Sequence, residues 1–315
     1  MSDGSNNVVI FAPVVLLTVT VEAGPENGAE VHLHPGGQGF WVARMLRHLG
    51  ERPLLCGPVG GESGGVIRGL LAQWGIDLSP VEISAGSPVI VQDRRGGDRV
   101  QIAETPMPHL TRHEQDDLYG TFLDHALNIS TAVVTGQWGE VVPLDEYKRL
   151  GHDLETGDVD VIGDLHGPEM RAFIEGGRMD VLKVSDQDLR EDGVIGEGPV
   201  DMREGVGLVD RLVAQGARNV ILSLAEGGAL ASLDGDHYRV RLPEFDPADH
   251  RGAGDSMTAG LTAAMLRNLS AAETLKLASA AGAANVTRHG LGSASTNLIA
   301  ELAERVEVEK IKGDS

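Results

Sequence analysis

Short apolar runs alternate with helical stretches from residue 132 onward, and this alternation constrains the fold more than any other feature. The runs lie at 132–135, 159–163, 181–184 and 220–224. They are rich in the aliphatic and β-branched residues that form strands buried on both faces. Strands that alternate with helices predict βαβ units, in which helices cover both faces of a parallel sheet.

The N-terminal third predicts a second, smaller sheet. Strands are expected at 8–11, 16–21 and 30–34, and residues 89–92 and 99–103 flank a glycine turn typical of a β-hairpin. Helices are expected at 39–49 and 64–74, and most of the segment 255–308 is expected to be helical. The chain therefore predicts one domain, 1–315, with a β appendage at about 13–35 and 87–105.

Composition excludes several classes of protein. The 315 residues are 41% hydrophobic, which is enough for a large core, and a net charge of −21 disfavours nucleic acid and anionic membrane as partners. The apolar segment 8–21 lacks a preceding Lys or Arg and contains Pro13, so we interpret it as buried β structure rather than an export signal. Cys56 is the single cysteine, which indicates a reducing, cytoplasmic location.

The segment 249–260 carries the clearest chemical signal. Small residues at Gly252, Ala253 and Gly254 precede an apolar helix, so their backbone N–H groups can form a concavity that suits a phosphoryl group. Asp255 would face that group and accept the proton of an attacking hydroxyl. An ordinary helix cap at 254–256 explains the same local pattern, because Asp and Ser favour that position.

This segment resembles the C-terminal signature of the ribokinase-like pfkB carbohydrate kinases, usually written Asp-Thr-x-Gly-Ala-Gly-Asp. The match comprises Asp249, Gly252, Ala253, Gly254 and Asp255, and His250 replaces the family's Thr. The resemblance implies that residues 252–254 form the anion hole and that Asp255 is the catalytic base.

Two N-terminal segments are similar to the same family. Residues 35–44 resemble its Gly-Gly-Lys-Gly-x-Asn-x-Ala segment, and residues 57–64 with 75–77 resemble a glycine-rich helix that ends in Gly-Val-Asp. Residues 36–44 and 103–106 are nearest to the 1-phosphofructokinase and tagatose-6-phosphate kinase branch. The resemblance implies a three-layer α/β/α core with a mainly parallel sheet plus a small β lid, and a homodimer formed through that lid.

The resemblance also implies a nucleotide site for ATP and Mg²⁺. The residues that it places there are Ser185, Asp188, Ser223, Glu226, Gly228 and Asn285, with Asp188 as the candidate magnesium residue. Asp188 would hold a magnesium-bound water, since Mg²⁺ keeps several waters and takes few protein ligands. A solvated helix start explains Ser185 and Asp188 equally well.

The acceptor side departs from the family pattern. The resemblance places Gly36, Gly37, Gln38, Trp41 and Glu104 around a small-molecule hydroxyl acceptor. Gln38 replaces a lysine, Trp41 an asparagine, and Leu16 stands where a sugar-binding aspartate is expected. An ordinary fructose phosphate pocket is therefore not predicted. Trp41 would either stack on a ring of the acceptor or pack between the lid and the core.

The sequence thus predicts an ATP-dependent kinase that transfers a phosphoryl group to a hydroxyl of a sugar, sugar phosphate or sugar-like metabolite. The alternative is a nucleotide-binding regulatory protein of the same fold that has lost acceptor binding. The departures at the acceptor side support the alternative, whereas the intact segment 252–255 supports the kinase.

Overall fold

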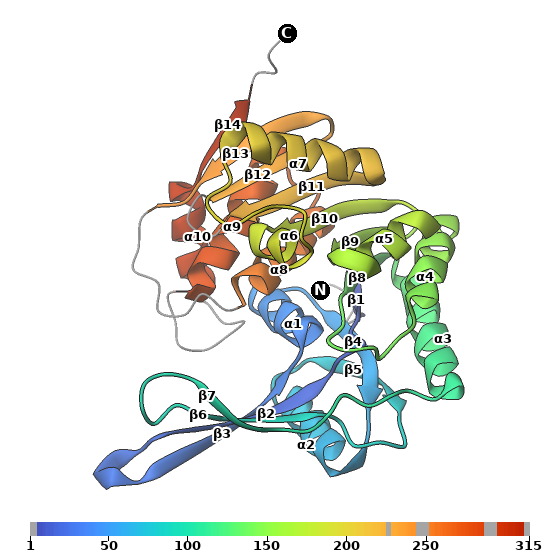
Figure 1. The fold of residues 1–315 in the computed structure, drawn as a ribbon, viewed down its shortest axis with the longest axis vertical. Helices are drawn as coiled ribbons and strands as arrows, with labels where there is room; N and C mark the ends of the chain where they lie inside the picture. The colour runs from blue at the N-terminus through green and yellow to red at the C-terminus, as the bar shows by residue number, and fades with distance from the viewer. Residues whose placement is uncertain (1–4, 225–227, 244–251, 287–294, 312–315) are drawn as a thin grey trace.

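The computed structural model describes residues 5–224, 228–243, 252–286 and 295–311. A ten-stranded sheet forms the centre of the molecule, in the order β14-β13-β12-β11-β10-β9-β8-β1-β4-β5 (Figure 1). The seven strands from β11 to β5 are parallel, and β12, β13 and β14 are added antiparallel at one edge. The strands of this sheet are β1 (Val8–Phe11), β4 (Pro53–Val59), β5 (Asp77–Glu82), β8 (Thr131–Thr135), β9 (Asp160–Asp164), β10 (Met179–Ser185), β11 (Ala217–Leu224), β12 (Gly228–Leu233), β13 (Asp236–Arg241) and β14 (Glu307–Ile311).

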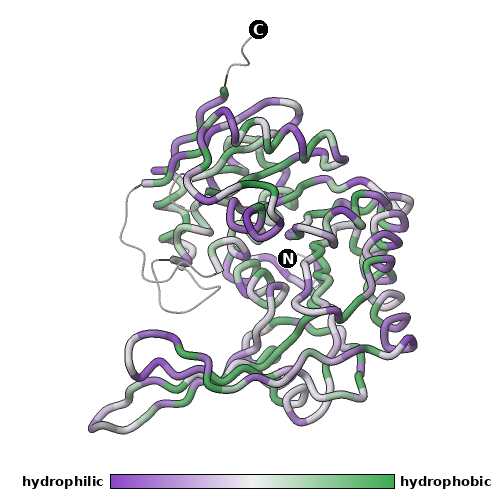
Figure 2. The backbone as a smooth tube through the Cα atoms, viewed as in Figure 1, coloured by the Kyte–Doolittle hydropathy of each residue, from purple (hydrophilic) through white to green (hydrophobic). Residues whose placement is uncertain are grey.

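Helices cover both faces of this sheet. One core contains residues of α1 (Gln38–His48), α2 (Gly61–Gln73), α8 (Ala253–Leu266), α9 (Ala271–Val286) and α10 (Thr296–Arg305). The core on the other face contains residues of α3 (Arg112–Ile129), α4 (Leu144–Thr156), α5 (Gly167–Gly176), α6 (Asp186–Glu191) and α7 (Met202–Gln215). Figure 2 shows hydrophobic residues along the strands and hydrophilic residues interspersed along the flanking helices.

The first strand shows why this sequence favours a sheet covered on both sides. Val8 and Ile10 pack into one core, Val9 and Phe11 pack into the other, and all four are at most 1% exposed. Successive side chains of a strand point to opposite faces, so an unbroken apolar run is stable only between two layers of helices. The predicted three-layer α/β/α core with a mainly parallel sheet is confirmed.

A second sheet of four strands projects from this core (Figure 1), in the order β3-β2-β6-β7. Its strands are β2 (Leu16–Ala23), β3 (Ala29–Gly36), β6 (Val89–Asp93) and β7 (Val100–Glu104), with a 3₁₀ turn at Pro25–Asn27. We call it the small sheet. β3 leads directly into α1, so the small sheet and the large sheet meet at the start of that helix.

The C-terminal end of the described chain differs from the expected helix. Residues 307–311 form the edge strand β14, which pairs with β13. Arg241 forms ion pairs with Glu307 and Glu309 across this edge, and Lys310 pairs with Asp236. Such pairing depends on a partner far away in the sequence, which helical periodicity does not report. Within the described ranges, no helix is both long and apolar enough to cross a membrane.

Candidate active site

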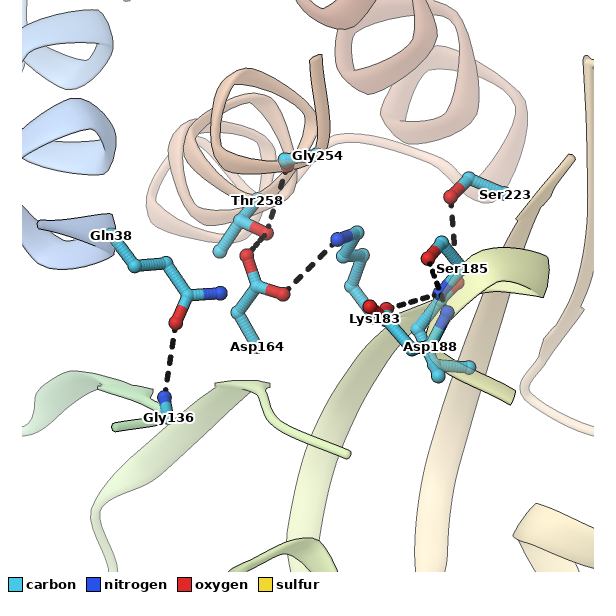
Figure 3. A network of polar contacts seen from close by, with 10 residues as sticks. Gln38, Gly136, Asp164, Lys183, Ser185, Asp188, Ser223, Gly254 and Thr258 are labelled. Carbon is cyan, nitrogen blue, oxygen red and sulfur yellow. Dashed lines mark hydrogen bonds and ion pairs between the residues drawn. The ribbon is translucent and has the colours of Figure 1, made fainter. Parts of the chain in front are cut away.

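The carboxyl ends of four neighbouring parallel strands bring the candidate site together. β8, β9, β10 and β11 lie side by side in that order, and they end next to Gly136, Asp164, Ser185 and Ser223. Side chains at the carboxyl ends of parallel strands meet along one edge of the sheet, which is where ligands of α/β proteins bind. Figure 3 shows Gln38 to one side of Asp164 and Lys183, with Ser185 and Ser223 to the other.

The predicted anion hole is the start of α8. Gly252 caps this helix in the left-handed region with φ of 71°, a conformation that glycine adopts without strain. Asp255 lies in the first turn and is partly buried. The first N–H groups of a helix have no partner within it, so this turn offers donors and a positive dipole end to an anion.

A buried polar network lies behind this turn. The Nζ of Lys183 donates to Oδ1 of Asp164 at 3.1 Å. The hydroxyl of Thr258 donates to the other carboxylate oxygen, Oδ2, at 2.7 Å. Asp164 and Lys183 are 4% and 5% exposed and Thr258 is fully buried, so these side chains depend on one another for their hydrogen bonds.

The charges around Asp255 adjust its acidity. Burial, followed by the negative charge of Asp164, raises the pKa of Asp255 to about 7, although Lys183 opposes the change. Burial by itself lowers the pKa of Lys183, but the carboxylates of Asp164, Asp188 and Asp255 leave that pKa above its ordinary value. Lys183 is therefore charged at neutral pH, and Asp255 titrates in the range where a general base works best.

The nucleotide-side residues occupy the next two strand ends. Ser185 and Asp188 form a reciprocal capping box at the start of α6, in which Asp188 N–H donates to Ser185 Oγ at 3.1 Å and Ser185 N–H donates to Asp188 Oδ2 at 2.8 Å. The capping hydrogen bond engages only Oδ2 of Asp188, so the structure agrees with both interpretations of this pair. Ser223 Oγ lies 3.5 Å from the Val184 carbonyl oxygen.

The other predicted nucleotide-side residues lie on neighbouring elements. Gly228 begins β12, and a Cβ there would lie 2.0 Å from the Val240 carbonyl oxygen, so close strand packing requires this glycine. Asn285 is buried at the end of α9, three residues after Gly282, which packs against Ala253. Glu226 lies outside the described residues, as do Asp249 and His250.

The acceptor-side residues gather at the junction of β3 and α1. Gly36 ends β3, Gly37 caps α1, and Gln38 Oε1 accepts a hydrogen bond from Gly136 N–H at 3.0 Å. Trp41 is 8% exposed, with its ring centroid 5.4 Å from that of His34 and 4.7 Å from that of Phe40. Trp41 thus packs between the small sheet and the core, which is the second of its two interpretations.

The remaining acceptor-side prediction lies on the small sheet. Glu104 is exposed at the end of β7 and accepts a hydrogen bond from Gln101. Leu16 is 5% exposed and packs beside Gly36, so it contributes to the core at the position where a sugar-binding aspartate was expected. A cavity of about 540 Å³ opens near Glu104, and its lining residues are Glu62, Ser63, Ala85, Gly86, Ser87, Val89, Thr105, Pro106, Met107 and Pro108.

Sequence reasoning did not select Asp164, Thr258 or Lys183 as site residues. Asp164 ends an apolar strand, and Lys183 interrupts the apolar run 181–184, which are signals of a polar role at the sheet edge. Residues 164 and 183 are paired neighbours in the register of β9 and β10. Only the strand order shows that they meet, so the sequence signal was present but incomplete.

The fold and this edge define a class: an α/β protein with a helix N-terminus and a buried polar network at the carboxyl ends of its parallel strands. A model of the pfkB family of carbohydrate kinases matches residues 7–298. The ATP-dependent 6-phosphofructokinase isozyme 2 of Mycobacterium tuberculosis is 27% identical over 259 residues, which cover 81% of this chain and 75% of the relative.

Two further comparisons agree with that match. The 1-phosphofructokinase of Bacillus subtilis is 25% identical over 289 residues, which cover 88% of this chain and 89% of the relative. The crystal structure of phosphofructokinase-2 from Escherichia coli in complex with potassium is similar in fold, with a TM-score of 0.82 and 22% identity over 95% of this chain and 98% of that one. The chain belongs to the pfkB family of carbohydrate kinases and is an ATP-dependent carbohydrate kinase.

Proposed function

We propose that this enzyme transfers the γ-phosphoryl group of ATP to a hydroxyl of a sugar-like acceptor, with Asp255 as the general base. Asp255 accepts the hydroxyl proton while the acceptor oxygen forms its bond to the γ-phosphorus. The bond from that phosphorus to the bridging oxygen breaks, and ADP leaves. The N–H groups of residues 252–254 stabilise the charge on the transferring group.

One observation carries this proposal: a carboxylate with a pKa near 7 lies in the first turn of a helix whose N–H groups can bind an anion. A base whose pKa is close to the working pH is deprotonated often enough to act and still binds a proton well. A carboxylate that only capped the helix would have no need of the neighbouring Lys183 and Asp164.

The nucleotide side fits a hydrated Mg²⁺. Asp188 keeps one carboxylate oxygen clear of its capping hydrogen bond and would bind a water of the ion, in agreement with the preference of Mg²⁺ for oxygen ligands and retained waters. Such an ion would neutralise charge on the nucleotide phosphates. Ser185, Ser223, Glu226, Gly228 and Asn285 remain the proposed nucleotide residues.

We assign the acceptor to the uncharged sugars and polyols. The cavity of about 540 Å³ beside the predicted acceptor residue Glu104 includes Glu62 and Ser87, and the described residues that line it include no Lys or Arg. A phosphate on the acceptor would have no charge-assisted hydrogen bond there, and Glu62 would repel it. Gly36, Gly37, Gln38, Trp41 and Glu104 remain the proposed surroundings of the acceptor, with Trp41 as a packing residue.

An acceptor screen tests this function. ADP release would be measured with Mg²⁺ and ATP against uncharged sugars, polyols, nucleosides and sugar phosphates. We expect acceptor-dependent release with at least one uncharged compound and much less with its phosphate. ATP binding without acceptor-dependent release from any compound would contradict the kinase and favour the regulatory protein, whose support is the packed state of Leu16 and Trp41.

The small sheet also supports a homodimer. Val31 and Leu33 on β3 are 57% and 45% exposed, and Val100 and Ile102 on β7 are 56% and 57% exposed. These are four of the nine exposed large hydrophobic residues in the described chain. Val31 and Leu33 pair with Val21 and Val19 on β2, so the side chains of these four valine and leucine residues share one face of the small sheet. Apolar faces of this kind are usually covered by another protein surface.

We expect Val31→Glu with Leu33→Glu to convert dimers to monomers, because the two carboxylates would be desolvated at the interface. Sedimentation velocity at about 10 µM measures this change. At that concentration a dimer with a Kd below about 1 µM remains intact. Val194→Glu is the matched control, since Val194 is 49% exposed and lies outside the small sheet. A wild-type chain that sediments only as a monomer would refute the dimer.

A further inference from the structure

The lack of room for a side chain, rather than a backbone conformation that requires glycine, explains the glycine at position 254. Gly254 lies inside α8 and is absent from the residues with positive φ, so an alanine could adopt its backbone angles. A Cβ at this position would nevertheless lie 2.5 Å from Nζ of Lys183 and 3.3 Å from its Cε. The ammonium group therefore occupies the volume that a side chain at 254 would need.

This ammonium group has little freedom to move aside. Lys183 and Asp164 face each other in the parallel register of β9 and β10, and their side chains are joined at 3.1 Å. Asp164 is held in turn by Thr258, which lies one turn after Gly254 on α8 and whose hydroxyl is also 3.2 Å from the Gly254 carbonyl oxygen. These contacts connect β10 through β9 to the first turns of α8.

We propose that Lys183 is a positioning residue for Asp255: its ammonium group, fixed by Asp164 and Thr258, sets where the 252–254 turn and the base after it lie relative to the sheet. This inference rests on the proposed function, because it assigns Lys183 a role in the reaction through Asp255. It explains three features together, namely a buried lysine, a glycine without a conformational need and a threonine bonded to a buried carboxylate.

The charge of Lys183 supports this role. The ammonium group opposes the effects of burial and of Asp164 on the pKa of Asp255. Without it, the carboxylate would lie beside two other acidic groups, Asp164 and Asp188, and would hold its proton at higher pH. A neutral side chain at 183 should therefore shift the pH dependence of the reaction as well as its rate.

A double-mutant cycle tests the proposal. Gly254→Ala should lower kcat/KM about 10²-fold in the wild-type background, because a displacement near 1 Å at a reacting group costs about that much. In the Lys183→Met background, where the ammonium group is gone, the same change should cost less than about threefold. Lys183→Met alone should move the midpoint of the pH dependence of kcat/KM to higher pH, which a solely structural role would not do.

The control is Gly69→Ala on α2, where a Cβ would meet nothing within 4 Å, and it should have no effect in either background. If Lys183→Met does not fold, the double variant Lys183→Met with Asp164→Asn becomes the background of the cycle. This double variant removes both partners of the ion pair and so leaves no buried charge. Equal costs of Gly254→Ala in both backgrounds, or an unmoved pH midpoint, would overturn the inference.

The experiment also separates this inference from the proposed function. Asp255→Asn would be measured alongside the cycle. If Asp255→Asn is inactive but the cycle shows no coupling, the positioning role fails and the base assignment stands. If Asp255→Asn keeps full turnover, both the base assignment and the role of Lys183 are wrong.

Discussion

Asp255→Asn is expected to lower turnover about 10²–10⁴-fold while ATP still binds, because the amide cannot accept the acceptor's proton. Turnover would be measured as ADP release and nucleotide binding by calorimetry. Asp201→Asn is the matched control, since Asp201 caps α7 by accepting from Glu204 N–H, a role that asparagine also fills. If Asp255 were only a cap, its variant would behave like this control.

The same variant has a second readout that needs no acceptor. The pKa of Asp255 is about 7 in the folded chain, against an ordinary value near 4. Between these two values the folded chain holds a proton that the unfolded chain releases, so stability falls as pH rises from about 4 to about 7 and is level above. Asparagine has no proton to lose, so Asp255→Asn should have a Tm above that of the wild type at pH 8 and an equal one near pH 4. A lower Tm at pH 8 would contradict the raised pKa.

The second large effect is expected from Asp164→Ala, which should lower the free energy of unfolding by about 3–5 kcal/mol. Lys183 would be left charged and without its carboxylate in a site where it is 5% exposed, and Thr258 would lose its hydrogen bond to that carboxylate. Urea unfolding followed by circular dichroism measures this loss, and the remaining folded fraction should also turn over more slowly.

A surface ion pair provides the comparison for Asp164. Glu82 pairs with Arg68 while its side chain is 75% exposed, so Glu82→Gln should cost no more than about 1 kcal/mol. Asp164→Asn with Lys183→Met should recover much of the stability that Asp164→Ala loses, because no buried charge remains. A loss below about 1 kcal/mol for Asp164→Ala would show that the network does not stabilise the sheet edge.

Local sequence patterns predicted helices, strands and turns well where an element is specified by its own residues, as in an apolar run or a glycine turn. The apolar run 8–11 became β1, and the glycine turn near 96 joined β6 to β7. The helical segment before Gly50 became α1. The expected helix was wrong at 307–308, because these residues pair with β13, a strand that lies about seventy residues earlier, and this contact leaves no local signal.

The candidate site was predictable only in part for the same reason. Small residues before an apolar helix indicated the turn at 252–254, and Asp255 followed from that turn and from the family resemblance. Trp41 was left with two interpretations, since an aromatic side chain is equally suited to a ligand and to packing. The structure shows Trp41 packed beside His34 on β3, and its role toward an acceptor stays a prediction.

The sequence by itself determined the class of fold and the place of the chemistry, because alternating apolar runs and a small-residue turn report burial and backbone shape directly. The tertiary structure alone decided that Lys183, Asp164 and Thr258 surround the turn. They come from two successive strands and from a helix much later in the chain, and they meet because β9 and β10 are neighbours and α8 lies over their ends. Strand order is a property of the whole sheet, so no local pattern contains it.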